Sequence, residues 1–105
     1  MIKAIQNRSD WDLGVSNNAL LLVDFFATWC GPCRMLAPTI ETLAQNNQDW
    51  LNVWKVDVDQ HPDLAQQYQI SSIPSLFLFK NGQVVASRVG GSDLATLQAW
   101  VDNHH

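Results

Sequence analysis

The segment that decides the fold is Leu20-Leu-Leu-Val-Asp-Phe-Phe-Ala-Thr-Trp-Cys-Gly-Pro-Cys33. Its first half is a short apolar run of the kind that forms a buried strand, and its end holds both cysteines of the protein. Pro32 suits the first turn of a helix, because its missing N–H is not needed there and its φ angle is already helical. The segment predicts a strand from Leu20 to Phe26, a tight turn, and a helix that starts at Cys30.

The spacing of the two cysteines predicts a reactive pair. Residues at i and i+3 share one face of a helical turn, at about the Cα separation that a disulfide needs. At a helix start, unpaired backbone N–H groups and the positive end of the helix dipole favour an anion. We therefore expect Cys30 to form a thiolate more readily than a free cysteine does, and to act as a nucleophile at neutral pH.

Two other uses of a cysteine pair stay open. Structural zinc needs four protein ligands, but the sequence has no second cysteine pair, and its histidines are His61, in a His-Pro turn, and the terminal His104-His105. An inert structural disulfide that closes so short a loop stabilises a protein by only about 2 kcal/mol. The pattern favours a bond that opens and closes.

The composition is that of a single domain, residues 1–105, with 47% hydrophobic and 15% charged residues. Six basic and ten acidic residues give a formal net charge of −4, and the basic residues are scattered from Lys3 to Arg88. A dispersed positive charge does not favour nucleic acid or an acidic membrane surface as a partner. We expect a monomer.

The cysteine usage and the N-terminal residues indicate the compartment. Residues 1–9 have no apolar core of signal-peptide length, and no apolar run in the chain approaches a membrane span. Both cysteines belong to the one motif, which leaves none for structural disulfides. A reducing cytoplasm is therefore the expected location.

Short apolar runs alternate with helical patterns along the chain, which is typical of an α/β fold. Asn81-Gly82 between two apolar runs is the strongest short signal for a β-hairpin. The expected order is βα, βα, βα, a β-hairpin and a last helix. The sequence does not give bounds for the first strand of this order. The other elements are a short helix opened by a capping box at Ser9–Asp12, strands at 20–26, 51–58, 75–80 and 83–89, and helices from about 32, over 62–68, and from 92 or 93. Open α/β sheets carry their sites at the carboxyl ends of the strands, so the cysteine turn is expected at that edge.

Four blocks of the sequence resemble the thioredoxin family. They are Val23–Pro38 with its Trp-Cys-Gly-Pro-Cys motif, Lys55–Asp59, Ile73–Gly82 and the Val89-Gly90 pair, and they recur in order from about Leu20 to Val101. The resemblance implies the thioredoxin fold, a three-layer α/β/α arrangement with a central mixed β-sheet flanked by helices.

A few positions depart from the family's pattern. Phe26 stands where thioredoxins often have Trp, Arg34 stands where Lys is common, and Ser71-Ser72 occupy a variable place before Ile73-Pro74. None of these changes removes a reacting group. They bear on redox potential and on partner choice.

The resemblance implies a protein-disulfide reductase. Cys30, expected to be the exposed member, attacks the disulfide of a target protein, and Cys33, expected to be more buried, resolves the mixed disulfide. The implied partner that reduces the chain again is thioredoxin reductase, which takes electrons from NADPH through its own flavin. The chain has no glycine-rich nucleotide loop, so no bound cofactor is expected.

Asp24 is the second candidate for chemistry. A carboxylate in the middle of an apolar strand is costly to bury unpaired, and loss of water raises its pKa. A buried carboxyl near Cys33 is able to accept and return the proton of that thiol, directly or through water. A salt bridge to Lys55, which the family places nearby, is the alternative, and the two roles are compatible. Lys55 itself is interpreted as a tuning charge.

Ile73-Pro74 precedes a predicted strand, and an X-Pro bond at such a turn is a candidate for the cis form. The resemblance implies a cis proline that faces the cysteines, with the backbone of the preceding residue pairing with substrate as an added strand. An ordinary turn proline is the alternative. The implied platform for docking partners consists of Trp29, Gly31, Pro32, Ile73 and Gly90.

The same fold also suits a binding or scaffold subunit, in which the cysteines are dispensable or act as a redox sensor. A scaffold does not need an intact cysteine pair together with Asp24 and Pro74, so this combination favours the reductase. Among enzymes the rival is an oxidase or isomerase, but the Gly-Pro pair between the cysteines resembles the reducing branch.

Overall fold

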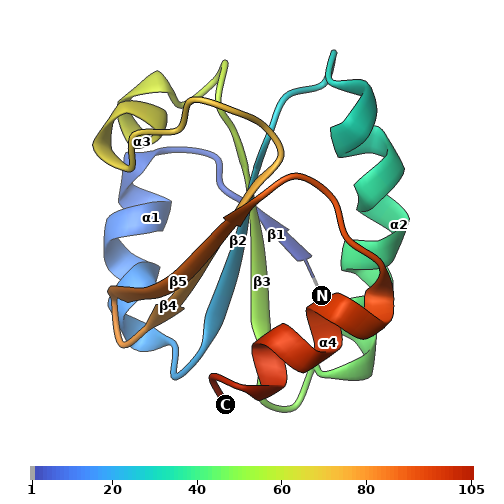
Figure 1. Ribbon diagram of the computed structural model, residues 1–105. Coiled ribbons are helices and arrows are strands. Elements are labelled where there is room, and N and C mark those ends of the chain that lie inside the picture. Colours follow the sequence, from blue (N-terminus) through green and yellow to red (C-terminus); the bar gives the residue numbers. More distant parts are fainter. Residues whose placement is uncertain (1) are drawn as a thin grey trace.

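A five-stranded mixed sheet organises residues 2–105, which are the residues that the computed structural model describes (Figure 1). The strands lie in the order β1-β3-β2-β4-β5. β1 and β2 run parallel to β3, whereas β4 runs antiparallel to both β2 and β5. Their bounds are β1 Ile2–Ala4, β2 Leu21–Phe26, β3 Asn52–Asp57, β4 Ser75–Lys80 and β5 Gln83–Val89.

Helices cover both faces of this sheet, which confirms the predicted three-layer α/β/α arrangement. On one face lie α1 (Arg8–Gly14) and α3 (Pro62–Gln67), and on the other lie α2 (Gly31–Asn46) and α4 (Leu94–Asp102) (Figure 1). A single 3₁₀ turn, Val15–Asn17, follows α1. The central strand β2 is therefore buried on both sides, as its continuous apolar run predicts.

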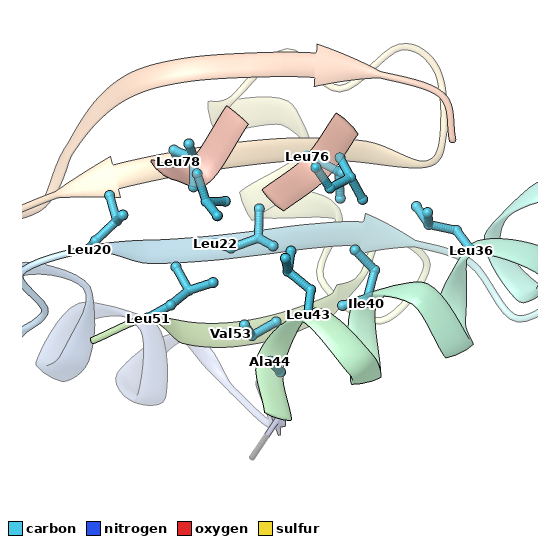
Figure 2. Close-up of a cluster of buried hydrophobic side chains, with 12 residues drawn as sticks. Leu20, Leu22, Leu36, Ile40, Leu43, Ala44, Leu51, Val53, Leu76 and Leu78 are labelled. Atoms are coloured by element: carbon cyan, nitrogen blue, oxygen red, sulfur yellow. The ribbon is translucent and has the colours of Figure 1, made fainter. Parts of the chain in front are cut away.

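Alternation of side chains along β2 divides the core in two. Leu20 and Leu22 face α2 and α4, where they pack with leucines of α2 and β4 (Figure 2). Leu21, Val23 and Phe25 face α1 and α3, where the ring of Trp11 lies in a cluster of aromatic side chains. Full burial of one such side chain stabilises the fold by about 1.5–3 kcal/mol, so both layers hold β2 in register. The rings around Trp11 belong to Phe25, Trp54, Tyr68 and Phe79.

The hairpin prediction is confirmed. Asn81 and Gly82, which join β4 to β5, have φ angles of 53° and 85°. Two consecutive positive φ angles match the twist of the flanking strands, and Asn and Gly adopt them at low cost.

The first helix differs from its prediction. Its N-cap is Asn7, whose side chain accepts a 2.9 Å hydrogen bond from the backbone N–H of Asp10, so the capping box expected at Ser9–Asp12 is wrong. The Asp10 carboxylate in turn accepts a 3.0 Å hydrogen bond from the backbone N–H of Gln6. Asn and Ser are about equally favourable as N-cap residues, so the sequence does not distinguish Asn7 from Ser9. The path of the chain from β1 into α1 decides which residue caps the helix.

Candidate active site

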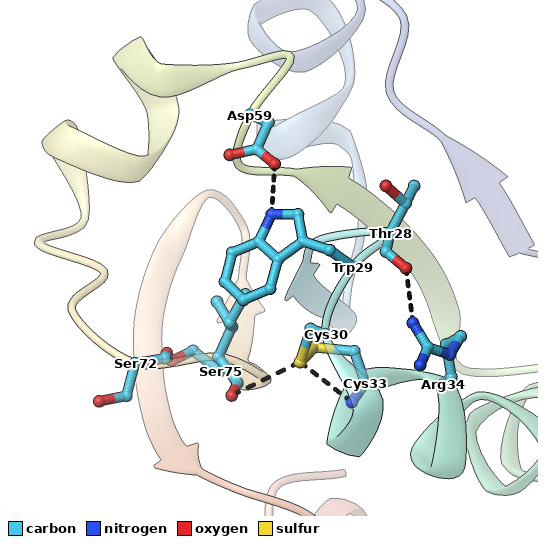
Figure 3. The surroundings of a disulfide bond; sticks show 9 residues. Thr28, Trp29, Cys30, Cys33, Arg34, Asp59, Ser72 and Ser75 are labelled. Atoms are coloured by element: carbon cyan, nitrogen blue, oxygen red, sulfur yellow. Dashed lines mark hydrogen bonds between the residues drawn. A yellow bond between two sulfur atoms is a disulfide. The ribbon is translucent and has the colours of Figure 1, made fainter.

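The two cysteines form a disulfide at the start of α2, at the carboxyl end of β2 (Figure 3). Their Cα atoms are 5.2 Å apart. Cys30 is the N-cap of the helix, and its Sγ accepts a 3.2 Å hydrogen bond from the backbone N–H of Cys33. Pro32 lies in the first turn. The predicted placement of Cys30 is confirmed, and its sulfur lies where the helix offers a free N–H to an anion.

The predicted difference in burial between the cysteines is wrong for this oxidised state. Cys30 is 4% exposed and Cys33 is 5% exposed. The reason is tertiary: both sulfur-bearing residues pack with Ala27, and the partly buried side chains of Val58 and Ile73 cover the group. The helix rather than exposure distinguishes the pair, because only Cys30 occupies the N-cap.

Ile73 and Pro74 lie against the disulfide from the loop before β4. The Ile73-Pro74 peptide bond is cis, and the carbonyl oxygen of Ile73 lies 3.9 Å from Sγ of Cys30. Gly90 adopts a φ angle of 89°, and its N–H donates a 2.8 Å hydrogen bond to the carbonyl oxygen of Pro74. The tertiary structure thus brings three predicted docking residues to one side of the disulfide.

Trp29 adds a large exposed apolar surface beside the disulfide, with 67% of the residue accessible. Its Nε1–H donates a 2.7 Å hydrogen bond to Oδ2 of Asp59 (Figure 3). The Asp59 backbone N–H in turn donates to the Asp57 carboxylate. Asp59 was absent from the sequence-based candidates. The available signal was its position just after a parallel strand, at the same sheet edge as the cysteines.

Arg34 is one of the departures from the family pattern. Its side chain contacts the turn that leads from β2 to the cysteines. Its guanidinium donates a 2.9 Å hydrogen bond to the carbonyl oxygen of Thr28 (Figure 3). A hydrogen bond to a charged donor is stronger than one between neutral groups. The contact ties the first turn of α2 to the residues that follow β2.

Asp24 is buried in β2, the strand that leads to the cysteines, with 2% of the residue exposed. It lies two residues after Leu22 in β2 and so shares the α2 face of the sheet. Its Oδ1 has no hydrogen-bond partner among the described residues. Burial raises the pKa of Asp24 to about 6, and the positive charge of Lys55 opposes part of that rise.

Lys55 lies opposite Asp24 in the pairing of β2 with β3. The expected alternative, a salt bridge between them, is not among the ion pairs of residues 2–105, which join Arg8 to Asp12 and Asp63. The Lys55 ammonium lies 4.6 Å from the centre of the Phe26 ring instead. Lys55 therefore acts on Asp24 through its charge at a distance.

A pocket with a volume of about 270 Å³ opens beside Cys33 on the same face of the sheet. Lys55 and Phe26, the neighbours of Asp24 on this face, form part of its wall. A space of this size admits several water molecules. It gives Cys33 a neighbouring open space on the face of the sheet to which Asp24 belongs. The lining residues are Phe26, Ala27, Thr28, Cys33, Arg34, Ala37 and Lys55.

Within residues 2–105, no three His, Cys, Asp or Glu side chains are grouped closely enough to hold a metal ion. None of the described helices is long and apolar enough to cross a membrane.

A disulfide at a helix start, faced by a proline loop on the carboxyl edge of a mixed sheet, defines a thiol-disulfide oxidoreductase. The family model described as Thioredoxin matches residues 2–103, and the chain belongs to the thioredoxin family. It works by thiol-disulfide exchange, and its redox group is the Cys30–Cys33 disulfide rather than a bound cofactor.

Named relatives and solved structures agree with this assignment. Thioredoxin-1 of Saccharomyces cerevisiae is 41% identical over 103 residues, which cover 98% of this chain and 99% of that protein. A bifunctional thioredoxin reductase/thioredoxin of Mycobacterium leprae is 47% identical over 83 residues, or 79% of this chain and 18% of that protein. The solution structure of oxidised thioredoxin from Plasmodium falciparum superimposes with a TM-score of 0.88 at 33% identity, covering 99% of this chain and 98% of that one. The fold is therefore the thioredoxin fold.

Proposed function

We propose that this chain is a general protein-disulfide reductase that carries electrons from thioredoxin reductase to disulfide-containing target proteins. The observation that carries the proposal is the Cys30–Cys33 disulfide at the start of α2, with the Ile73 carbonyl facing it. The Mycobacterium leprae relative, named as a reductase and a thioredoxin in one chain, supports thioredoxin reductase as the electron donor. NADPH and flavin then belong to that reductase.

The exchange proceeds in two steps. The Cys30 thiolate attacks one sulfur of the target disulfide, forms a mixed disulfide and expels the other target sulfur as a thiolate. Cys33 then loses its proton and attacks Sγ of Cys30, which restores the Cys30–Cys33 disulfide and releases the second target thiolate. Two electrons pass from the chain to the target. The helix N-terminus stabilises the Cys30 thiolate, because the Cys33 N–H already points at Sγ of Cys30.

Asp24 accepts the proton that Cys33 loses. A pKa raised to about 6 leaves the carboxyl mostly ionised at neutral pH and closer to the pKa of a thiol than an exposed aspartate is. The pocket beside Cys33, whose wall includes Lys55 and Phe26, supports a proton path through water on this face of the sheet. Lys55 is the tuning charge that keeps the carboxyl ionised.

The docking surface surrounds the disulfide. A target segment pairs with the backbone of Ile73 as an added strand, and its disulfide then reaches Sγ of Cys30. Trp29 supplies the apolar area, and residues with small side chains leave the approach open. The complete set is Trp29, Gly31, Pro32, Ile73, Pro74 and Gly90. We further propose that residues 1–105 are one domain, which acts as a monomer in the cytoplasm.

Reduction of insulin disulfides by NADPH and a thioredoxin reductase tests the function. Wild-type chain is expected to couple NADPH oxidation to insulin reduction, and Cys30→Ser is expected to abolish it. A wild-type chain that leaves insulin oxidised, although dithiothreitol reduces its own disulfide, would overturn the proposal and favour a scaffold or sensor role.

A further inference from the structure

The loop between β5 and α4 forms one wall of the docking surface. Gly90 is bonded to Pro74, and a Cβ added at Gly90 would meet no atom within 4 Å, so this face of the loop is open to a partner. Gly91 and Ser92 line a pocket of about 240 Å³ together with Pro32 of α2. The position of the loop relative to α2 therefore sets the width of the surface that a target meets. The remaining lining residues are Met35, Leu36 and Thr39.

Arg88, the next-to-last residue of β5, spans the base of this loop. Arg88 pairs with Leu76 of β4 and so lies on the α4 face of the sheet. Its guanidinium carbon is 5.3 Å from the centre of the Trp100 ring, and its Nη2 donates a 3.0 Å hydrogen bond to Oγ of Ser92. One side chain thus connects the sheet, the end of the loop and α4.

The contacts of Arg88 suit a positioning role more than an electrostatic one. No carboxylate lies within 4.0 Å of Arg88 in residues 2–105, where the ion pairs belong to Arg8. A planar guanidinium is able to stack on an indole and donate to a hydroxyl at the same time, whereas an ammonium lacks that fixed geometry. Arg88 therefore links Ser92 to Trp100 through its own side chain.

We propose that Arg88 is a positioning residue for target binding. It holds the loop of Gly90, Gly91 and Ser92 in a fixed position relative to α2, and this position sets the width of the docking surface. The proposal rests on the proposed function. Arg88 lies on the α4 side of β5 and does not touch the sulfur atoms. Its loss is expected to weaken binding of protein targets while leaving the dithiol chemistry intact.

The test uses pre-reduced protein in single-turnover reduction of insulin over a range of insulin concentrations. Arg88→Met is expected to raise the half-saturating insulin concentration about threefold to tenfold, the effect of one lost hydrogen bond and one lost cation–π contact. The limiting rate, the rate with a small aromatic disulfide and the redox potential against glutathione should not change. Arg88→Lys should restore part of the affinity.

Two further variants make the result specific. Lys3→Met is the matched control, because Lys3 also places a cation over a tryptophan, 5.4 Å from the Trp54 ring, but on the opposite side of the core. Its half-saturating concentration should equal that of wild type. Ser92→Ala should also raise the half-saturating insulin concentration. The double variant with Arg88→Met should raise this concentration little further. A shifted Gly90 amide resonance in Arg88→Met, but not in Lys3→Met, reports the loop directly.

The outcomes separate the two proposals. An unchanged half-saturating concentration in Arg88→Met, or an equal slowing with the small disulfide, overturns the positioning role. If Arg88→Met does not fold, Ser92→Ala alone tests the proposal. A half-saturating insulin concentration equal to that of wild type in Ser92→Ala then overturns the positioning role. A wild-type protein that reduces neither insulin nor the small disulfide overturns the proposed function, and the positioning role falls with it.

Discussion

The indole of Trp29 is fixed by Asp59, which accepts a 2.7 Å hydrogen bond from Nε1. The two residues are separated by 30 positions in the sequence, and each follows a strand that ends at the same edge of the sheet. The bond holds an exposed, flat apolar side chain over the disulfide. It links a carboxylate with no direct role in exchange to the proposed docking surface.

Asp59→Ala is expected to loosen the Trp29 ring and raise the half-saturating insulin concentration. One exposed hydrogen bond contributes about 0.5–1.5 kcal/mol, so the expected loss of affinity is about twofold to tenfold. Asp59→Asn keeps an acceptor oxygen and should lie close to wild type. Equal affinities for wild type and Asp59→Ala in the single-turnover assay would show that the orientation of Trp29 does not matter for docking.

The two cysteines should respond differently to replacement. Cys30→Ser has no nucleophile at the helix start and should neither reduce nor trap targets. Cys33→Ser should still attack but should retain targets as mixed disulfides, because no thiol remains to resolve them. A non-reducing gel of either variant after incubation with oxidised insulin shows the adduct. Equal trapping by the two variants would refute the assignment of nucleophile and resolving thiol.

Asp24→Asn should change stability with pH. Because the folded pKa is raised to about 6 from 3.8, the folded state binds more protons than the unfolded state between those values. Ionisation of Asp24 therefore destabilises the wild-type fold progressively from about pH 4 to pH 6. The variant loses this penalty, which is on the order of 3 kcal/mol above pH 6 and vanishes in acid.

Urea titrations of the oxidised proteins at pH 4 and pH 8 measure this difference. Insulin reduction should move the opposite way and slow in Asp24→Asn near neutrality, because Cys33 loses its proton acceptor. A variant that is less stable at pH 8 and reduces insulin at the wild-type rate would make Asp24 a structural ion-pair partner.

Asn47 joins α2 to α4 and is expected to matter for stability alone. It is buried, donates to the Leu43 carbonyl at 2.8 Å, and exchanges two hydrogen bonds with the amide of Gln98 at 2.7 and 3.0 Å. Asn47→Ala leaves buried groups unpaired and should destabilise the fold by about 1–3 kcal/mol.

The matched control is Asn17→Ala. Asn17 donates the same kind of bond to the carbonyl four residues earlier, that of Leu13, but it is exposed. Its loss should cost less than about 1 kcal/mol, because water replaces the lost partner. Urea midpoints measure both variants, and insulin reduction below the transition should stay at the wild-type rate. Equal midpoints for the two variants would contradict a role for the Asn47–Gln98 contact.

Short-range features of the fold were accessible from the sequence. The apolar run before the cysteines, Pro32 in the first helical turn and the Asn81-Gly82 pair act on residues within a few positions of themselves. Their signals are local: a continuous apolar run, a fixed φ angle and two positive φ angles. Strand ends still differ by one residue, and β3 runs from Asn52 to Asp57 where 51–58 was expected.

The N-terminal strand was not accessible in the same way. Ile2–Ala4 is only three residues long and lacks a clear alternation. It is a strand because Ile2 pairs with Val53 at the edge of β3. A strand this short has no stability of its own, so only the assembled sheet decides its existence.

The sequence by itself determined that this protein carries a reactive cysteine pair at a helix start, and the family resemblance implied the partners and docking residues that are proposed for it. The tertiary structure alone decided how the site is built around that pair. It covers Cys30 as fully as Cys33, bonds the Trp29 indole to Asp59 and leaves Lys55 without an ion pair to Asp24. The reason is that the residues involved are far apart in the sequence. Only the packing of β2 between its neighbours brings them together.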